Sequence, residues 1–202
     1  MTHSGRAGSG CSAIVLAAGA GSRYAAESGR FKLLEPLSDG RPMARAVCES
    51  ALPSVDEVVL VGHWHRDRLA EALLDLPVRI VSCAAAALGM GASIKCGVAA
   101  LAQHRAVLIL LADMPYVAPA TVGAVCQALR DGAGIARPVH AGRLGHPVGF
   151  GSWFRGALLS LDDAHGAASL VRANADVLQQ VEVDDGGCLH DVDVPADLVA
   201  RL

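Results

Sequence analysis

Two basic side chains follow the first apolar segment of the chain and suit the handling of a phosphate chain. The run at Ser12–Ala18 leads into Gly19 and Gly21, and Arg23 and Lys32 come shortly afterwards. Glycines let backbone N–H groups approach phosphate oxygens closely. An arginine can grip these oxygens bidentately, and a lysine adds a point charge. Because charge builds on the pyrophosphate that leaves a reacting triphosphate, these residues are candidates for triphosphate binding and catalysis.

Asp113 is the candidate metal ligand. It stands in LILLADMPYV, where four apolar residues predict a buried strand and Met114-Pro115 ends it. Ligands of open α/β sheets bind beyond the carboxyl ends of the strands. A carboxylate at that place can hold Mg²⁺ against phosphate oxygens. The alternative is a carboxylate that only caps the following turn.

Two aspartates in the last part of the sequence are candidates for a second metal-binding carboxylate. Asp191 and Asp193 lie two residues apart in HDVDVPADL, so on a strand both would face the same way. Like charges so close favour a cation between or near them, and one of the two is expected to complete a metal site with Asp113. The alternative for Asp193 is a helix N-cap ahead of Pro195, and the two roles are compatible.

Alternating strand and helix patterns predict a three-layer α/β/α, Rossmann-like fold with a mostly parallel sheet. The expected strands are 12–18, 57–61, 78–81, 106–111, 135–139, 146–150 and 177–183. The expected helices are 42–51, 66–74, 91–101, 121–130, 152–159, 166–174 and 195–202. Residues 1–10 are expected to be a flexible tail, and residues 11–202 a single domain.

Composition narrows the class of protein. The 202 residues carry 17 basic and 20 acidic side chains, so no basic surface indicates nucleic-acid binding. The longest apolar runs are too short to cross a membrane, and the start of the chain lacks the apolar core of a signal peptide. The six cysteines form no closely spaced pair, so we expect them to be reduced and structural in a soluble, cytoplasmic protein.

Two common glycine motifs do not fit the first loop. The dinucleotide fingerprint G-x-G-x-x-G/A requires Gly or Ala where Tyr24 stands, and the P-loop G-x-x-x-x-G-K-[ST] is absent. A plain strand-to-helix turn is the remaining alternative for this segment alone.

With Lys32, the segment LAAGAGSRY resembles the signature L-A-A-G-x-G-x-R-[MF]…K of nucleotidyltransferases with the nucleotide-diphospho-sugar-transferase fold. It is most similar to that of the MobA/MocA-like molybdenum cofactor nucleotidyltransferases. The segments GMGASIKCGV, LILLADMPYV, RLGHPV and HDVDVPADL resemble further motifs of this family, in the expected order. The chain departs from the family at Tyr24-Ala25-Ala26, and at Ala168, where the family often has arginine.

The resemblance implies roles for individual residues. The implied catalytic residues are Arg23, Lys32 and Asp113. The implied nucleotide-binding residues are Ala17, Ala18, Gly19, Gly21, Ser22, Arg23, Lys32, Gly91, Ser93 and Asp113. The implied acceptor-binding residues are Met114, His146 and Pro147, although His146 equally fits a plain wall of the cleft. The implied metal ligands are Asp113, Asp191 and Asp193. By themselves, the small residues around Gly91 are also typical of a well-packed helix start.

The implied reaction is a Mg²⁺-dependent transfer of a nucleoside monophosphate to the phosphate of molybdopterin, with release of pyrophosphate. The LAAG form resembles the cytidylyl branch, which favours CTP, and the product would serve a molybdenum hydroxylase. One alternative is a transferase that uses GTP or another triphosphate and acts on a sugar or polyol phosphate. Another is a non-catalytic carrier or insertion chaperone for the molybdenum cofactor.

Overall fold

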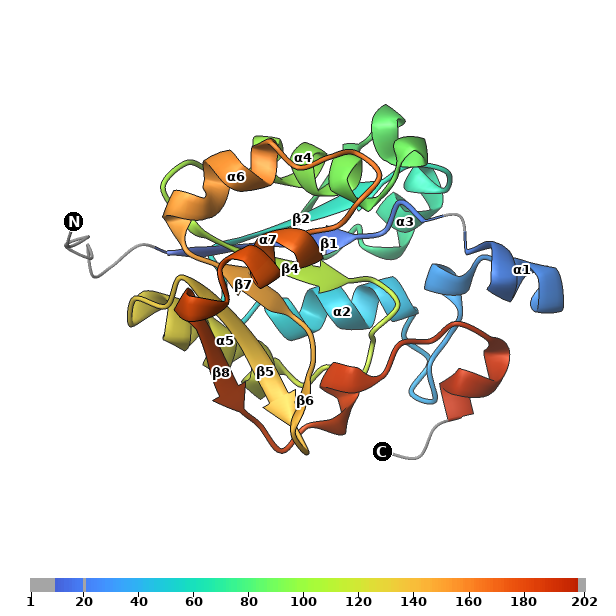
Figure 1. Ribbon diagram of the computed structural model, residues 1–202. Coiled ribbons are helices and arrows are strands. Elements are labelled where there is room, and N and C mark those ends of the chain that lie inside the picture. Colours follow the sequence, from blue (N-terminus) through green and yellow to red (C-terminus); the bar gives the residue numbers. More distant parts are fainter. Residues whose placement is uncertain (1–9, 20, 200–202) are drawn as a thin grey trace.

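The computed structural model describes residues 10–19 and 21–199, so all but Gly10 of the expected tail lies outside the described residues. Figure 1 shows a sheet with helices on both faces. The sheet has eight strands in the order β3-β2-β1-β4-β7-β5-β6, and β8 pairs with β5. Its strands are β1 (Cys11–Leu16), β2 (Glu57–Gly62), β3 (Val78–Ser82), β4 (Ala106–Leu111), β5 (Ile135–His140), β6 (Arg143–Leu144), β7 (Val148–Phe150) and β8 (Leu178–Glu182).

The sheet is mostly parallel but mixed, which confirms the predicted fold class. Strands β1 to β4 pair in parallel, as do β5 and β8. The short strand β7 runs antiparallel between β4 and β5, and β6 is antiparallel to β5. The carboxyl ends of β1 and β4 therefore lie side by side at one edge, with Leu16 opposite Leu111.

The described residues form seven α-helices: α1 (Ser22–Ser28), α2 (Met43–Ala51), α3 (Arg66–Ala72), α4 (Met90–Ala100), α5 (Pro119–Arg130), α6 (Arg155–Leu159) and α7 (Ala168–Ala173). In Figure 1, α4 and α6 lie above the sheet, while α2 and α5 lie below it.

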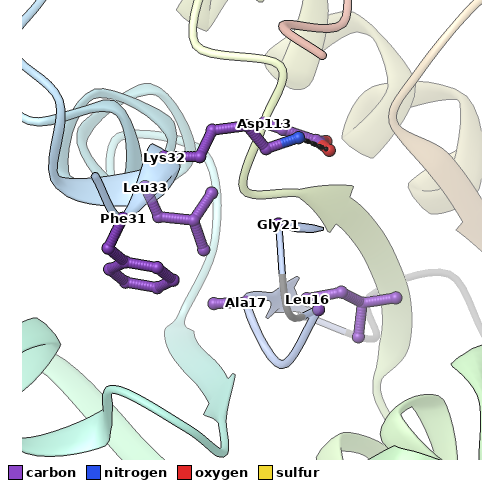
Figure 2. Close-up of a pocket in the computed structure, with 8 residues that line it drawn as sticks. Leu16, Ala17, Gly21, Phe31, Lys32, Leu33 and Asp113 are labelled. Carbon is purple, nitrogen blue, oxygen red and sulfur yellow. Dashed lines mark hydrogen bonds and ion pairs between the residues drawn. The ribbon is translucent and has the colours of Figure 1, made fainter. Parts of the chain in front are cut away.

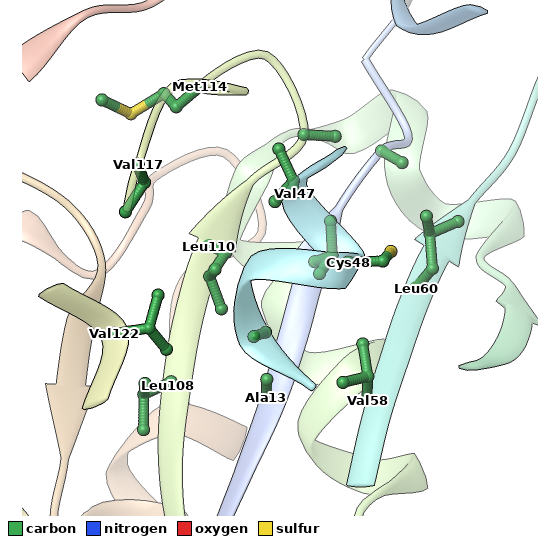
Figure 3. Packing of buried hydrophobic residues seen from close by; sticks show 14 of the residues in the cluster. Ala13, Val47, Cys48, Val58, Leu60, Leu108, Leu110, Met114, Val117 and Val122 are labelled. Atoms are coloured by element: carbon green, nitrogen blue, oxygen red, sulfur yellow. The ribbon is translucent and has the colours of Figure 1, made fainter. Parts of the chain in front are cut away.

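Successive strand residues face opposite layers. In β4, Leu108 and Leu110 pack in the cluster that includes residues of α2 and α5, whereas Val107 and Ile109 pack in the cluster of α4, α6 and α7. Figure 3 shows the first cluster, in which Leu110 lies near Val47 of α2 and Leu108 lies near Val122 of α5. Both faces of the central strands are thus buried, which explains why they read as continuous apolar runs.

Three local expectations need correction. Helix α1, absent from the prediction, follows the first loop directly. The expected terminal helix is a 3₁₀ helix over Pro195–Val199, and residues 200–202 lie outside the description. The expected strand at residues 146–150 is shorter and starts at Val148.

The prediction of six reduced cysteines is wrong for one pair. Cys83, just after β3, and Cys96 in α4 form a disulfide with a Cα–Cα distance of 6.0 Å. Their sequence separation of 13 gives no short-spacing signal, and only the return of α4 over the sheet brings them together. The other four cysteines are buried free thiols. Burial raises the pKa of the Cys48 thiol to about 12, as expected for an unreactive core cysteine.

Within the described residues, no helix has the length and apolar character needed to cross a membrane.

Candidate active site

The loop after β1 opens a pocket at the carboxyl edge of the sheet. Gly21 adopts a left-handed conformation, with φ 60° and ψ 30°, and precedes helix α1. A residue with a side chain rarely adopts this conformation, which explains the glycine. A Cβ on Gly19 would meet open space. The backbone at Gly19 is therefore accessible to a ligand, as the glycines of this loop led us to expect.

Lys32 and Asp113 meet in this pocket. Figure 2 shows their side chains pointing toward each other across the pocket from the glycine loop. The lining residues are Leu16, Ala17, Gly19, Gly21, Phe31, Lys32, Leu33 and Asp113. Five of the ten predicted nucleotide-binding residues thus share one pocket.

A network of ion pairs joins both ends of the chain at this place. The Nζ of Lys32 lies 2.8 Å from Oδ2 of Asp113 and 3.6 Å from Oδ1 of Asp193. Nη1 of Arg23 lies 2.6 Å from Oδ2 of Asp193. The Lys32 side chain is only 8% exposed, whereas that of Arg23 is 77% exposed. Arg23 can therefore swing to a ligand, while Lys32 is held in the pocket.

Long-range hydrogen bonds place Asp193 beside Asp113. The backbone N–H of Val192 donates to the carbonyl of Asp113 at 2.8 Å. The Asp197 carboxylate accepts from the N–H groups of Asp193 and Val194. No strand forms at residues 190–194, so the expectation that Asp191 and Asp193 share a strand face is wrong.

The two late aspartates therefore differ. Asp193 pairs with Arg23 and Lys32, whereas Asp191 is exposed and makes no ion pair with a described residue. The capping bonds come from Asp197, so the alternative of Asp193 as the cap is not what the structure shows. The sequence signal for Asp197 was present, because an acidic residue in the first turn is common.

His146 lies beside a second, mainly apolar hollow. The lining residues are Val47, Leu110, Leu111, Met114, Val117, His146 and Pro147. The three predicted acceptor-binding residues are thus together, but Met114 is 4% exposed and packs in the core. Burial, reinforced by the charge of Arg137, lowers the pKa of His146 to about 4, so the ring is neutral at pH 7.

The other five predicted nucleotide-binding residues, Ala18, Ser22, Arg23, Gly91 and Ser93, do not line this pocket, and the last two lie on α4. Gly91, in the first turn of α4, faces the loop at 162–165, and an added Cβ would overlap the carbonyl oxygens of Asp162 and His165. Ser93 is buried in the same helix. The small size of Gly91 is therefore explained by backbone packing, and a contact of either residue with a nucleotide stays a prediction.

Sequence reasoning missed Phe31 and Leu33, which line the pocket on either side of Lys32. Apolar neighbours of a lone lysine were the available signal, because they indicate that the lysine is drawn out of solvent.

The carboxylates suit a hard divalent cation. Asp113 and Asp193 both come within 4 Å of one ammonium group, so their oxygens converge on a single cationic point. No group of three His, Cys, Asp or Glu side chains that could hold a metal ion exists among the described residues. The predicted set of Asp113, Asp191 and Asp193 is therefore not preassembled. Two carboxylates plus phosphate and water oxygens match the usual surroundings of Mg²⁺.

Known proteins are similar to this chain in sequence and in fold. Residues 13–180 match the profile of the MobA-like NTP transferase domain. The chain belongs to this family. As a class, its members transfer nucleotides, and this agrees with the relatives described next.

Among curated proteins, the chain is similar to the bifunctional protein GlmU of Alkalilimnicola ehrlichii, with 33% identity over 166 residues. The match covers 82% of this chain but 33% of that GlmU, so the chain spans about a third of the length of the curated relatives it matches.

Solved structures agree over nearly the whole chain. A nucleotidyl transferase from Methanothermobacter is 28% identical with a TM-score of 0.79, and the match covers 94% of each chain. The protein Rv0371c of Mycobacterium tuberculosis is 25% identical with a TM-score of 0.79, over 94% of this chain and 95% of that one. Rv0371c has also been solved in complex with manganese, at 23% identity and a TM-score of 0.74 over 93% and 95% of the two chains.

Proposed function

We propose that this MobA-like transferase moves CMP from CTP to the phosphate of a molybdopterin-type acceptor and releases pyrophosphate, with Mg²⁺ as cofactor. The observation that carries the proposal is the convergence of Asp113, Asp193 and Lys32 beside the glycine loop. Cationic and anionic groups at one edge of a parallel sheet suit a triphosphate and its metal.

The triphosphate is proposed to lie over the loop at residues 17–19 and 21–22. Backbone N–H groups of the loop face its oxygens, and Lys32 lies below with a fixed ammonium group. Arg23 exchanges its exposed contact with Asp193 for the phosphate chain. This exchange of partners by Arg23 costs little free energy, because an ion pair of exposed side chains contributes at most about 1 kcal/mol.

The reaction then depends more on the positioning of the acceptor phosphate and the triphosphate than on proton transfer. An ionised oxygen of the acceptor phosphate attacks the α-phosphorus, and the bond from that phosphorus to the bridging oxygen of pyrophosphate breaks. The nucleophile is already charged at neutral pH, so no strong general base is needed. Arg23 and Lys32 stabilise the charge on the leaving pyrophosphate. Mg²⁺, when bound by Asp113 and Asp193, would neutralise charge on the phosphate oxygens.

The choice of CTP rests on the LAAG segment, Leu16 to Gly19, and the choice of acceptor rests on the order of the family motifs. The product would pass to a molybdenum hydroxylase in the cytoplasm.

The test is pyrophosphate release from CTP, GTP and ATP with Mg²⁺, in the presence and absence of molybdenum cofactor. We expect release that needs the pterin, prefers CTP and is lost in Asp113→Ala. Asp67→Ala serves as the matched control, because the Asp67 side chain is 95% exposed on α3. A preference for GTP or a sugar phosphate would redirect the substrate assignment. Pterin binding without release from any triphosphate would refute catalysis and favour a carrier.

A further inference from the structure

Arg137 is a charged residue inside a strand that is otherwise mostly buried. It lies in β5, two residues after Ile135, which packs in the cluster of α4, α6 and α7. Residues two apart in a strand face the same side, so Arg137 faces that layer near the carboxyl end of β5. The side chain is partly buried.

This guanidinium has no anionic partner in the part of the chain that the structure describes. Its Nε and Nη2 atoms both donate to the carbonyl of Gly145, at 3.1 and 3.0 Å. No carboxylate of the described residues forms an ion pair with Arg137. A guanidinium carries five N–H donors, and the two bonds to Gly145 leave three for a ligand. A partly buried charge without a counter-ion is unfavourable, which points to an anion that the protein alone does not supply.

A buried polar atom without a hydrogen bond in the described part of the chain belongs to His146, the residue after Gly145. Nδ1 of His146 is buried and has no hydrogen-bond partner among the described residues. His146 directly follows the carbonyl that Arg137 holds, and its own N–H donates to the carbonyl of Cys188 at 2.8 Å. The backbone is therefore fixed on both sides of the ring. Buried polar atoms rarely lack a hydrogen-bond partner, so we expect Nδ1 of His146 to form a hydrogen bond with a ligand atom.

The two groups share the electrostatic surroundings of the proposed reaction. The charges of Asp113 and Asp191 raise the pKa of His146, whereas the charge of Arg137 lowers it. His146 also lines the hollow that Met114, the residue after Asp113, lines.

We propose that the Arg137 guanidinium and the Nδ1–H of His146 together bind the phosphate monoester of the acceptor, and so orient the attacking oxygen. This inference rests on the proposed function for its biological meaning, but the anion site itself does not require that function. Arginine offers a planar fork to phosphate oxygens, and the neutral imidazole adds one directional donor.

The first test measures the site without nucleotidyl transfer. Inorganic phosphate is titrated into ¹⁵N-histidine-labelled protein, and the Nδ1 resonance of His146 is assigned from its loss in His146→Gln. We expect a saturable shift, with a dissociation constant that rises about 10- to 100-fold in Arg137→Gln, as for the loss of a charged hydrogen bond. Arg105→Gln is the control, because Arg105 precedes β4 and pairs with Asp56 at the opposite edge of the sheet.

Arg137→Lys is the control for a folding defect, since it keeps the charge and loses only the planar guanidinium. Its dissociation constant for phosphate should lie between those of the wild type and Arg137→Gln. A His146 resonance that does not respond to phosphate would overturn the site. An unchanged dissociation constant in Arg137→Gln, with a native thermal transition, would also overturn it.

The second test uses the active transferase. Arg137→Gln should raise KM for molybdenum cofactor about 10- to 100-fold and leave KM for CTP within about twofold. A raised KM for CTP with an unchanged KM for the acceptor would contradict the inference. If phosphate shifts the His146 resonance as expected but no triphosphate yields pyrophosphate, the proposed function fails while the anion site stands.

Discussion

The Nζ of Lys32 lies 2.8 Å from Oδ2 of Asp113, although the two residues are separated by 81 positions in the chain. Lys32 opens a short 3₁₀ helix, and Asp113 follows β4. The ammonium also approaches Asp193, so in the protein alone it stands where the two carboxylates would hold a metal ion. Lysine and metal therefore compete for the same oxygens until phosphates give the lysine another partner.

This competition predicts the metal affinity of Lys32→Gln. Without nucleotide, Mn²⁺ should bind this variant about tenfold or more tightly than the wild type, because a repelling charge next to both carboxylates is gone. Titration followed by electron paramagnetic resonance measures the dissociation constant. Lys95→Gln is the control, since Lys95 pairs with Asp163 away from the pocket. Equal or weaker Mn²⁺ binding in Lys32→Gln would show that no such competition exists.

The same substitution should have the opposite effect on turnover. Lys32→Gln removes a cation that stabilises the leaving pyrophosphate, and a drop in kcat on the order of 10²–10³ is expected. Steady-state pyrophosphate release measures it, beside Lys95→Gln. A kcat within threefold of the wild type would remove Lys32 from the catalytic groups.

Gly91→Ala should lower the free energy of unfolding by about 1–3 kcal/mol. The added Cβ would overlap the carbonyl oxygens of Asp162 and His165, and backbone atoms cannot turn away as a flexible side chain can. Gly156→Ala in α6 is the matched control. Its Cβ meets open space, and alanine favours a helix, so a gain of about 0.5–1 kcal/mol is expected. Urea unfolding compares both; equal stability of the two variants would contradict the packing at Gly91.

His146 should make the protein less stable in mild acid. Its pKa is lowered from 6.5 to about 4 in the folded protein, chiefly by burial and then by Arg137, while Asp113 and Asp191 oppose the shift. Between these two values the unfolded chain binds more protons than the folded one, so the free energy of unfolding falls as the pH falls from 6.5 to about 4. The loss should be on the order of 1–3 kcal/mol.

Chemical unfolding at a series of pH values measures this loss. His146→Gln should flatten that part of the profile, while the exposed His104→Gln should keep the slope of the wild type. A slope that persists in His146→Gln would assign it to other groups.

The disulfide between Cys83 and Cys96 should stabilise the protein. Closing a loop of this length contributes about 3 kcal/mol, so Cys96→Ser should lose about 2–3 kcal/mol under non-reducing conditions. The difference should vanish when both proteins are measured with a reductant. Thiol titration of the denatured wild type should find four free cysteines, and a result of six would contradict the bond.

The central strands and the first half of the site follow from local patterns in the amino-acid sequence. Leu108 and Leu110 alternate with Val107 and Ile109, and this short-range pattern decides that β4 is buried on both faces. Because the carboxyl ends of parallel strands meet at one edge, the glycine loop, Lys32 and Asp113 were predicted at a common place without any knowledge of distances.

Contacts between distant segments place Asp193, and not Asp191, beside Lys32 and Asp113. Asp191 and Asp193 are equivalent in a local pattern. The hydrogen bonds from the N–H of Val192 to the carbonyl of Asp113 and from the N–H of Asp193 to the carboxylate of Asp197 fix the segment outside any strand. The disulfide likewise joins residues that only the packing of α4 brings together.

The same holds for the anion site that we infer at Arg137 and His146. Their residue types are visible in the sequence. Only the folded chain shows that the guanidinium has no counter-ion among the described residues and that the buried ring nitrogen has no hydrogen bond there. Local pattern specifies strands because neighbours in sequence are neighbours in space. Unsatisfied charge is a property of the whole fold, because it depends on every segment that packs around the group.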